Sequence, residues 1–139
     1  VNGNLKMGYS QIGQELFDIL QKYIGSKKCL YATNNGEFKL RKDNGHGIWL
    51  YDFKYLNKII EYQGDMYHAN PKLYEADDNP HPFRKELSAK EIWEKDKNKR
   101  ISAESNGYEI LYIWDSEFRK VGYKKRMATI QKCLDFILS

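Results

Sequence analysis

Ile48-Trp-Leu-Tyr-Asp-Phe53, followed after four residues by Lys58-Ile-Ile-Glu-Tyr62, is the stretch that decides the fold. Both segments are rich in β-branched and aromatic residues, which favour extended structure. The linking Lys54-Tyr-Leu-Asn57 has the length of a tight bend, so we expect two neighbouring strands. An acidic residue interrupts each apolar segment near its end: Asp52 in the first and Glu61 in the second.

Upstream of this stretch, the sequence predicts one helix and two further strands. Residues 10–24 have apolar positions at helical spacing. Strand-like segments follow at 29–32 and 37–41, and Asn34-Asn35-Gly36 between them has the chemistry of a hairpin turn.

Downstream, all three prolines fall in residues 69–87, which have no period and therefore predict a long irregular connection. Ser88-Ala-Lys-Glu91 is a capping box and predicts a helix over residues 88–106. An apolar strand at 108–114 and a helix at about 123–138 complete the order αββββαβα. A helix that crosses over before the last strand indicates an α/β protein with a mixed sheet flanked by helices.

The length of 139 residues suits a single domain over residues 1–139. Charged residues make up 30% of the chain and the mean hydropathy is -0.78, which predicts a soluble globular protein. No run approaches the roughly 18 apolar residues of a membrane span, so we expect no membrane partner. Val1 in place of methionine suggests a processed chain or a piece excised from a longer one.

The cysteines and the charges add two further expectations. Cys29 and Cys133 lie far apart and match neither a disulfide framework nor a zinc-binding spacing, which favours a reducing, cytoplasmic setting. The net charge is only +4, but residues 119–132 form a basic block without an acidic residue. The block favours a polyanionic partner, although a solvated helix face explains it equally well. Its members are Arg119, Lys120, Lys124, Lys125, Arg126 and Lys132.

Asp52 and Glu61 are the first candidates for chemistry. Neighbouring strand ends can bring two carboxylates within reach of one hard cation. Mg²⁺ uses a small number of carboxylates, together with water and phosphate oxygens. The alternative is that both side chains cap strand ends and face solvent.

His68 and Asp96 are further candidates, each with a bland alternative. His68 follows the turn after the second strand, where a solvent-facing histidine would be equally ordinary. Asp96 lies on the apolar side of the predicted helix, where a carboxylate needs a partner such as an imidazole. In a helix this charged, Asp96 could equally face water. His46 and His81 have the contexts of loop histidines, and helical spacing alone leaves Glu15 on the boundary or surface of the first helix.

Two long stretches resemble a known family: "WLYDFKYLNKIIEYQGDMYHANP" (49–71) and "AKEIWEKDKNKRISAESNGYEILYIWDSEF" (89–118). They look like the very-short-patch-repair-like endonucleases. This branch of the PD-(D/E)xK superfamily serves as a catalytic domain in phage and intron-encoded homing endonucleases. The resemblance covers roughly residues 8–137, including the opening "GYSQIGQELFDIL", and implies a PD-(D/E)xK-like core with a central mixed sheet.

The active site of this branch is written EDxHD, and the pattern falls on Glu15, Asp52, His68 and Asp96. The resemblance implies that Asp52 binds the metal and that His68 positions or deprotonates the attacking water. It further implies that Asp96 orients His68 and that Glu15 holds water around the metal.

The chain also departs from the family pattern. Gln63 stands where the superfamily motif usually has lysine, which is consistent with water activation by His68 and leaves Gln63 an active-site candidate. Glu61 is then a second metal ligand. The cysteines that hold zinc in the repair enzyme are missing, so no zinc is expected. Mg²⁺ is the expected cofactor, with Mn²⁺ as a substitute.

The function implied is a magnesium-dependent endonuclease that hydrolyses phosphodiester bonds in double-stranded DNA, as the catalytic domain of a homing endonuclease. A homodimer would be one means of cutting both strands, and a phage-encoded enzyme would act in the host cytoplasm. The basic block would contact DNA phosphates. Further phosphate contacts are expected from scattered lysines, namely Lys54, Lys58, Lys97 and Lys99.

Two other functions compete with this one. A non-catalytic nucleic-acid-binding module on the same fold would bind DNA in a salt-dependent manner without cleavage. A ββα-metal nuclease would use His68 and Asn70, but its histidine lies on a hairpin that feeds directly into a helix. Here Pro71 and the irregular connection follow instead.

Overall fold

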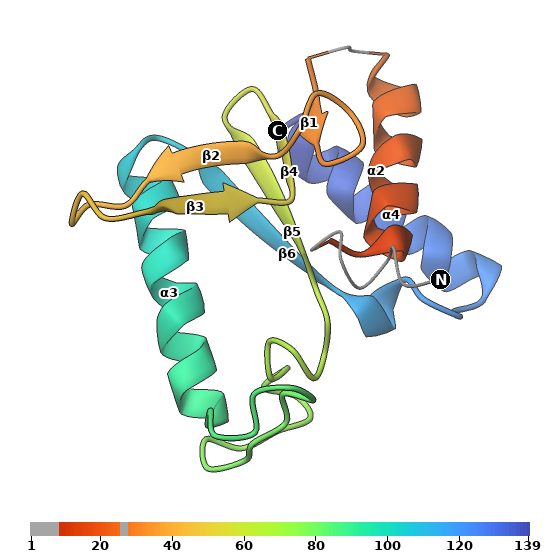
Figure 1. The fold of residues 1–139 in the computed structure, drawn as a ribbon. Helices are drawn as coiled ribbons and strands as arrows, with labels where there is room; N and C mark the ends of the chain where they lie inside the picture. The colour runs from red at the N-terminus through yellow and green to blue at the C-terminus, as the bar shows by residue number, and fades with distance from the viewer. Residues whose placement is uncertain (1–8, 26–27) are drawn as a thin grey trace.

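The computed structural model describes residues 9–25 and 28–139. The predicted domain begins at residue 1, so its first eight residues, including Gly8 of the family-like stretch, lie outside the described residues. The described residues form a mixed four-stranded sheet with helices on both faces, and a separate two-stranded sheet (Figure 1). The predicted α/β class, with a mixed sheet flanked by helices, is confirmed.

The helices begin and end where local sequence chemistry directs them. Ser10 Oγ accepts a hydrogen bond from Gly13 N at 3.1 Å, and Gly25 ends the first helix with a left-handed φ of 69°. The capping box is confirmed, because Ser88 Oγ accepts from Glu91 N at 3.2 Å while the Glu91 carboxylate accepts from Ser88 N at 3.0 Å. Within the described ranges, no helix is both long and apolar enough to cross a membrane. The helices are α2 (Gln11–Ile24), α3 (Ala89–Ser105) and α4 (Tyr123–Ile137).

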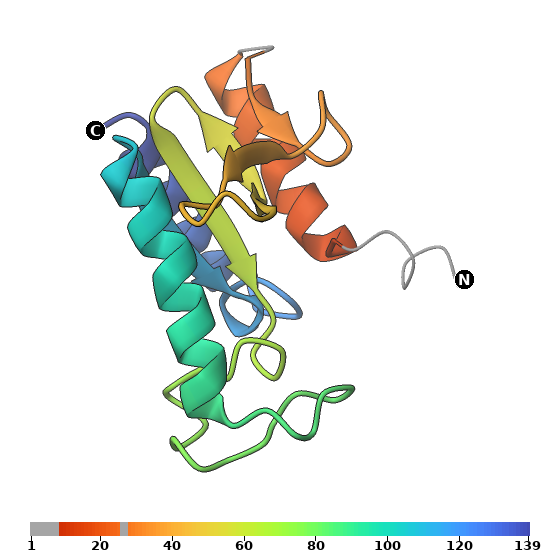
Figure 2. The same cartoon turned by 60° about the vertical axis from the view of Figure 1, so that its left-hand side comes forward.

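The described residues contain five strands before α3 and one after it, whereas the sequence predicted four strands before this helix. The strands are β1 (Leu30–Tyr31), β2 (Phe38–Arg41), β3 (Ile48–Tyr51), β4 (Phe53–Tyr55), β5 (Lys58–Gln63) and β6 (Glu109–Trp114). The larger sheet has the order β1-β4-β5-β6, and β2 pairs with β3 in the smaller sheet. β5 pairs antiparallel with β4 and parallel with β6, so α3 is the crossover between β5 and β6 (Figure 2). A short 3-10 turn, η1 (Asp115–Glu117), follows β6.

The prediction of one continuous strand over residues 48–53 is wrong, because the chain changes sheets at Asp52. β3 ends at Tyr51 and pairs with β2, whereas β4 begins at Phe53 and pairs with β5. The backbone N–H of Asp52 donates to Glu61 Oε1 at 2.7 Å. This change of sheet holds Asp52 beside β5.

The two faces of β5 pack against different helices (Figure 2). Ile60 and Tyr62 belong to the large apolar core that β5 shares with α2 and α4. Ile59 faces the other way and packs in a smaller cluster with Ala103 of α3. Because side chains alternate along a strand, Glu61 shares the face of Ile59 and points toward α3.

The irregular connection predicted at residues 69–87 is confirmed, since this segment contains neither helix nor strand. Trp93 of α3 fastens its beginning, because the indole Nε1 donates to the carbonyl of Ala69 at 2.6 Å. His68 is the residue before this anchor, so it is held close to the first half of α3.

Candidate active site

Asp52 and Glu61 contact each other across β4 and β5, as their positions near two neighbouring strand ends predicted. The Asp52 N–H donates to Glu61 Oε1 at 2.7 Å, and the Tyr62 N–H donates to Asp52 Oδ2 at 2.8 Å. These bonds fix both carboxylates against the backbone. They leave Asp52 Oδ1 without a hydrogen bond to any residue that the structure describes.

Lys99 of α3 reaches this pair of carboxylates from the opposite side. Its Nζ lies 2.7 Å from Glu61 Oε2, and the side chains of Lys99 and Glu61 are only 19% and 5% exposed. Two carboxylates this close repel each other unless a positive charge is near. The Lys99 ammonium therefore stabilises an arrangement that the carboxylates alone would disfavour.

The cluster perturbs the pKa values of its own groups. Burial, and then the charge of Glu61, raise the pKa of Asp52 well above the usual range of an aspartic acid, although Lys99 opposes the shift. Burial alone would lower the pKa of Lys99, but Glu61 and Asp52 outweigh burial and raise it. Burial and the charge of Glu61 thus disfavour the ionised form of Asp52, and a further cation at this position would favour it.

His68 and Asp96 form the second pair of the site. His68 Nδ1 lies 2.9 Å from Asp96 Oδ2, and the two side chains are 33% and 23% exposed. When Asp96 is ionised and the imidazole is neutral, Nδ1 carries the proton of this hydrogen bond and Nε2 is the acceptor nitrogen. The structure thus brings together the histidine and the aspartate that the family resemblance pairs.

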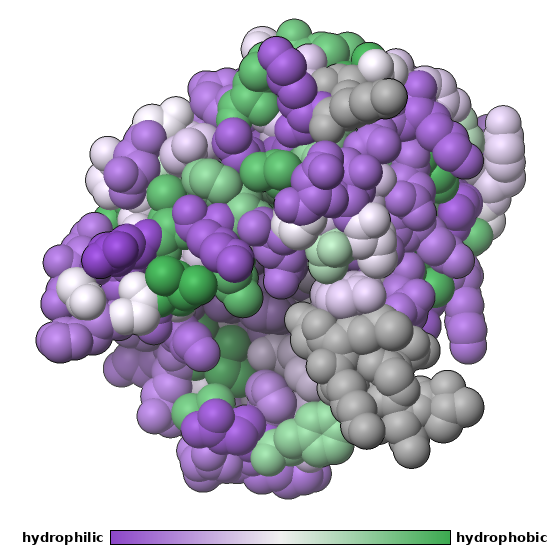
Figure 3. Space-filling model, turned by 45° about the horizontal axis from the view of Figure 1, so that its top comes forward, coloured by the Kyte–Doolittle hydropathy of each residue, from purple (hydrophilic) through white to green (hydrophobic). Residues whose placement is uncertain are grey.

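One cavity of about 910 Å³ joins the two pairs, since its lining includes Asp52, Glu61, Lys99 and His68. The molecular surface is hollowed near the centre of the face seen in Figure 3, with hydrophilic and hydrophobic side chains around the hollow. The volume is in the range of ordinary ligand sites. These four ionisable groups therefore line a space that a ligand can enter.

Glu15 does not join the other three residues of the EDxHD pattern. It is exposed on α2 and does not line the cavity, whereas Gln11 and Gln14 of the same helix do. Successive residues of a helix point about 100° apart, so the burial of Gln14 turns Glu15 outward. Gln14 is held by Thr33, whose N–H and hydroxyl both donate to its side-chain oxygen.

Gln63 also lies apart from the carboxylates, although the resemblance places it at the usual lysine position. It shares the face of Glu61 but is two residues further along β5, which is about 6.6 Å. Gln63 consequently lines a second, smaller cavity, which it shares with His68.

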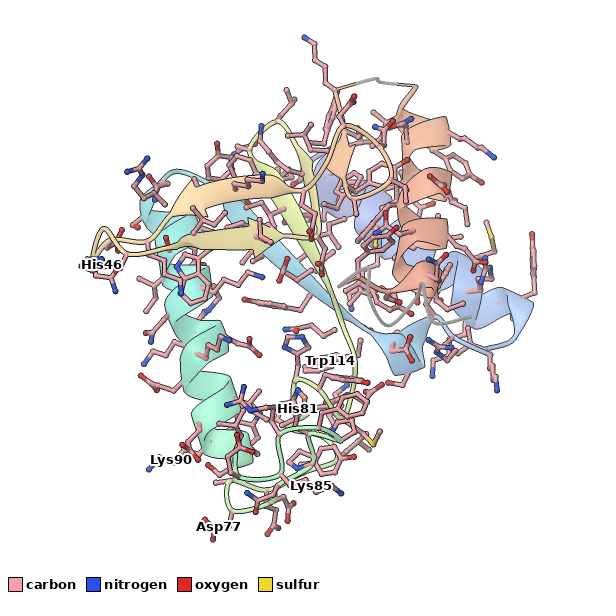
Figure 4. The ribbon with its side chains drawn as sticks, in the orientation of Figure 1. His46, Asp77, His81, Lys85, Lys90 and Trp114 are labelled. Atoms are coloured by element: carbon pink, nitrogen blue, oxygen red, sulfur yellow. The ribbon has the colours of Figure 1, made fainter. Side chains whose placement is uncertain are left out.

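The other histidines lie outside the site. Figure 4 shows His46 at the tip of the β2–β3 hairpin and His81 in the irregular connection. Asn70, which a ββα-metal nuclease would need beside His68, donates instead to Asp65 Oδ1 at 2.6 Å. In the described part of the chain, His68 is not on a hairpin that leads directly into a helix, so the ββα-metal arrangement is not formed.

The basic block lies in the turn after β6 and along α4, and part of its charge is already paired. Arg119 Nε lies 2.7 Å from Asp115 Oδ2, and Arg119 also lines the larger cavity. Lys132 Nζ lies 3.0 Å from Glu117 Oε1. The role of the block in DNA binding stays a prediction. Its exposed lysines at the start of α4 and just before it are Lys120, Lys124 and Lys125.

Lys99 and Glu37 line the larger cavity, although the sequence did not predict them there. Lys99 was expected only as a scattered phosphate contact, but its spacing of three residues from Asp96 puts both on one face of α3. That spacing was the available signal, and the many other charges of the helix obscured it. Glu37 also lines the cavity, where burial and then Glu61 raise its pKa. Only the pairing of distant strands could have revealed it.

Asp52 and Glu61 are the neighbouring carboxylates that could hold a hard cation. Among the residues that the structure describes, no group of three or more His, Cys, Asp or Glu side chains could hold a metal ion. Zinc sites need three or four such ligands, usually with nitrogen or sulfur donors. Mg²⁺ needs only one or two carboxylates with water and phosphate oxygens, and both oxygens of Glu61 are already bonded, to the Asp52 N–H and to Lys99.

Comparisons of this chain with models of protein families, with curated proteins and with solved structures found no match. A function for this chain is therefore proposed from the geometry of two pairs of residues, Asp52 with Glu61 and His68 with Asp96.

Proposed function

We propose that this chain is a magnesium-dependent DNA endonuclease of the very-short-patch-repair-like branch, with a PD-(D/E)xK core, and that it is the catalytic domain of a homing endonuclease. One observation carries the proposal: Asp52, Glu61 and His68 line the same cavity, and Asp96 holds His68 from behind. A water-activating base beside a carboxylate pair is the equipment that phosphodiester hydrolysis requires.

Asp52 and Glu61 would hold Mg²⁺, which when bound polarises a phosphoryl oxygen and stabilises charge on the leaving oxygen. Asp52 Oδ1 is the oxygen best suited to this role, because no described residue donates to it. His68 Nε2 would accept the proton of the attacking water, since Asp96 keeps the other ring nitrogen protonated.

Lys99 would supply the positive charge that the superfamily usually takes from the strand motif. Gln63 cannot provide it, because an amide carries no charge and lies at the second cavity. The Lys99 ammonium, 2.7 Å from Glu61, is suited to neutralise charge that develops on the phosphate.

Double-stranded DNA is the proposed partner. Arg119 at the larger cavity and the exposed lysines of the basic block offer sequence-independent phosphate contacts. A homodimer would place one cavity on each strand. The buried, unpaired Cys29 and Cys133 support a reducing, cytoplasmic setting.

Nicking of supercoiled plasmid DNA tests the proposal. The wild-type protein should convert plasmid to nicked or linear forms with Mg²⁺ or Mn²⁺ and should be inactive in EDTA. Asp52→Asn and His68→Ala should each lower the rate by about 100-fold or more, because each removes a group that acts on the reacting atoms.

Two matched substitutions serve as controls. His46→Ala removes a histidine at the tip of the β2–β3 hairpin, and Asp77→Asn removes an exposed carboxylate at the outer end of the irregular connection (Figure 4). Both should nick DNA at the wild-type rate. Equal rates for His68→Ala and His46→Ala would refute the role of His68.

A non-catalytic DNA-binding module is the second candidate, favoured by the ion pair between Lys99 and Glu61. That pair supplies a cation to the carboxylates without a metal. This function predicts DNA binding that is weakened by salt, unchanged by Mg²⁺ and followed by no cleavage product.

A further inference from the structure

A second cavity of about 360 Å³ adjoins the candidate active site, and His68 lines both. Its volume is at the lower end of the range for ligand sites, about 300–1,000 Å³. The strands β5 and β6 form one wall and the first half of α3 forms the other. Three of its lining residues are aromatic: Trp93, Tyr112 and Trp114. The label in Figure 4 shows Trp114 at the side of the sheet that faces this space.

Gln63 gives the cavity a polar group that the fold itself does not use. The residue as a whole is only 4% exposed, but its amide atoms are not sealed from solvent, since Ser102 Oγ is the one fully buried side-chain polar atom without a partner among the described residues. The Gln63 amide is thus open to the cavity that it lines. A ligand that offers both a donor and an acceptor would satisfy the amide.

Two cationic side chains line the cavity, so it favours a ligand that carries negative charge. Arg100 and Lys97 lie on the α3 wall, and Asp96, the acidic residue of the lining, is already bonded to His68. Trp93 is fixed in place because its Nε1 donates to the Ala69 carbonyl at 2.6 Å. The cavity thus combines a fixed aromatic surface with an amide, a guanidinium and an ammonium group.

We infer that this cavity binds one unstacked deoxynucleotide of a DNA strand. A neighbouring phosphate of the same strand would lie at His68. A nucleobase would stack on the indole and phenol rings, its polar edge would bond the Gln63 amide, and its phosphate would meet Arg100. Stacking of this kind is how many proteins hold bases that have left the duplex. The inference rests on the proposed function, because His68 connects the cavity to the site of hydrolysis.

The three tryptophans of the chain provide a direct test by NMR. The indole N–H signals of ¹⁵N-labelled protein, assigned with single Trp→Phe variants, are followed while each of the four deoxynucleoside 5′-monophosphates is added in EDTA. The signals of Trp93 and Trp114 should shift and saturate. Trp49 lies on β3 and lines neither cavity, so its signal should stay in place. Absence of shifts, or the same shifts with inorganic phosphate alone, would overturn the inference.

Gln63→Leu, which keeps the size of the side chain but removes the amide, should weaken nucleotide binding about five-fold. The matched Gln131→Leu on the exposed surface of α4 should bind as the wild type does. If Gln63→Leu fails to fold, Arg100→Met replaces it and should weaken binding of the 5′-monophosphates but not of the nucleosides. Unchanged affinity in the folded variant would overturn the role of that residue and with it the inference.

A binding experiment with DNA distinguishes a site for a nucleotide extruded from a duplex from a site for free nucleotides. A short duplex with one bulged nucleotide should bind the wild-type protein about tenfold more tightly than the same duplex with an abasic bulge. Equal affinities would show a site for free nucleotides only and would overturn the inference. If the protein nicks plasmid but its indole signals do not shift, the proposed nuclease function stands and the assignment of the cavity is overturned. If the signals shift but no nicking occurs, the assignment of the cavity stands and the nuclease function is overturned.

Discussion

The two faces of strand β5 differ in polarity, although both are buried. Toward α2 and α4 the strand presents Ile60 and Tyr62, which pack in an apolar core. Toward α3 it presents Glu61 and Gln63, which are buried as deeply but are polar. The apolar face therefore supplies the stability that holds charged groups in place on the polar face.

The apolar face is built from closely packed aromatic rings. The centroids of Phe17 and Phe53 lie 5.1 Å apart, and those of Tyr31 and Phe53 lie 5.8 Å apart. These rings are 1% exposed or less. Burial of such side chains contributes about 1.5–3 kcal/mol each to folding.

The largest effect is expected from Phe118→Ala, which removes a fully buried ring from the apolar face. It should lower the free energy of unfolding by about 3–5 kcal/mol, through lost burial and the cavity left behind. Urea denaturation measures this change. Phe83→Ala, which truncates a ring that is 69% exposed, is the control and should shift the free energy by less than about 0.5 kcal/mol. Equal effects of the two variants would contradict the comparison.

Lys99→Met should have the next largest effect, because it leaves Glu61 and Asp52 without their counter-charge on the polar face. We expect a loss of about 3 kcal/mol at pH 7, by urea denaturation. Lys97→Met, two positions earlier on α3 and exposed, should leave stability nearly unchanged. A Lys99→Met protein as stable as Lys97→Met would show that the ion pair does not hold the polar face together.

Asp52→Asn should abolish nicking and yet raise the free energy of unfolding at neutral pH by about 1 kcal/mol, as is common when a charged functional group is removed. The sign follows from the raised pKa of Asp52. Between the ordinary pKa of aspartic acid, about 3.9, and the raised pKa, the folded protein binds more protons than the unfolded chain. The stability of the wild type therefore falls as the pH rises through this window.

Thermal unfolding at a series of pH values tests that sign. Asp52→Asn lacks the titrating group, so its advantage over the wild type should be full above the raised pKa and should vanish below about pH 4. An advantage that grows as the pH falls would contradict the direction of the shift.

The smallest expected effect is on the reactivity of the two thiols, which test how tightly the apolar face is packed. Cys29 and Cys133 are both fully buried in the apolar core. Burial raises the pKa of the Cys133 thiol to about 12 and also raises that of Cys29. Ellman's reagent at pH 8 should modify neither thiol in the folded protein and both in urea. Rapid reaction of either thiol without urea would show that this face opens readily.

Much of the fold was predictable because its signals are local. The capping box at Ser88, the helical spacing of residues 10–24 and the irregular connection at 69–87 each depend on neighbouring residues, and the structure confirms them. The contact between Asp52 and Glu61 was predictable for the same reason, since a short turn joins their strands. The change of sheet at Asp52 was not, because strand-like residues continue through it.

The rest of the site depends on tertiary packing. Lys99 and Glu37 meet Glu61 only after distant segments have docked, so their residue types alone said nothing of a shared cavity. Glu15 shows the opposite case, in which a family pattern indicated a position that the burial of Gln14 turns outward. Neighbouring residues of a helix point about 100° apart, and the apolar stripe of a helix is about as wide. An amphipathic pattern therefore does not decide which of two neighbouring residues faces the cavity.

The parallel pairing of β5 with β6 also determines when the site can assemble during translation. A nascent chain that has left the ribosome only as far as the irregular connection carries Asp52, Glu61 and His68, but neither Asp96 nor Lys99. Parallel pairing cannot close until β6 has emerged, because β6 follows α3 along the chain. The Asp52–Glu61 pair needs only the turn between its strands, whereas Asp96 and Lys99 reach His68 and Glu61 only when α3 docks on the sheet that β6 completes.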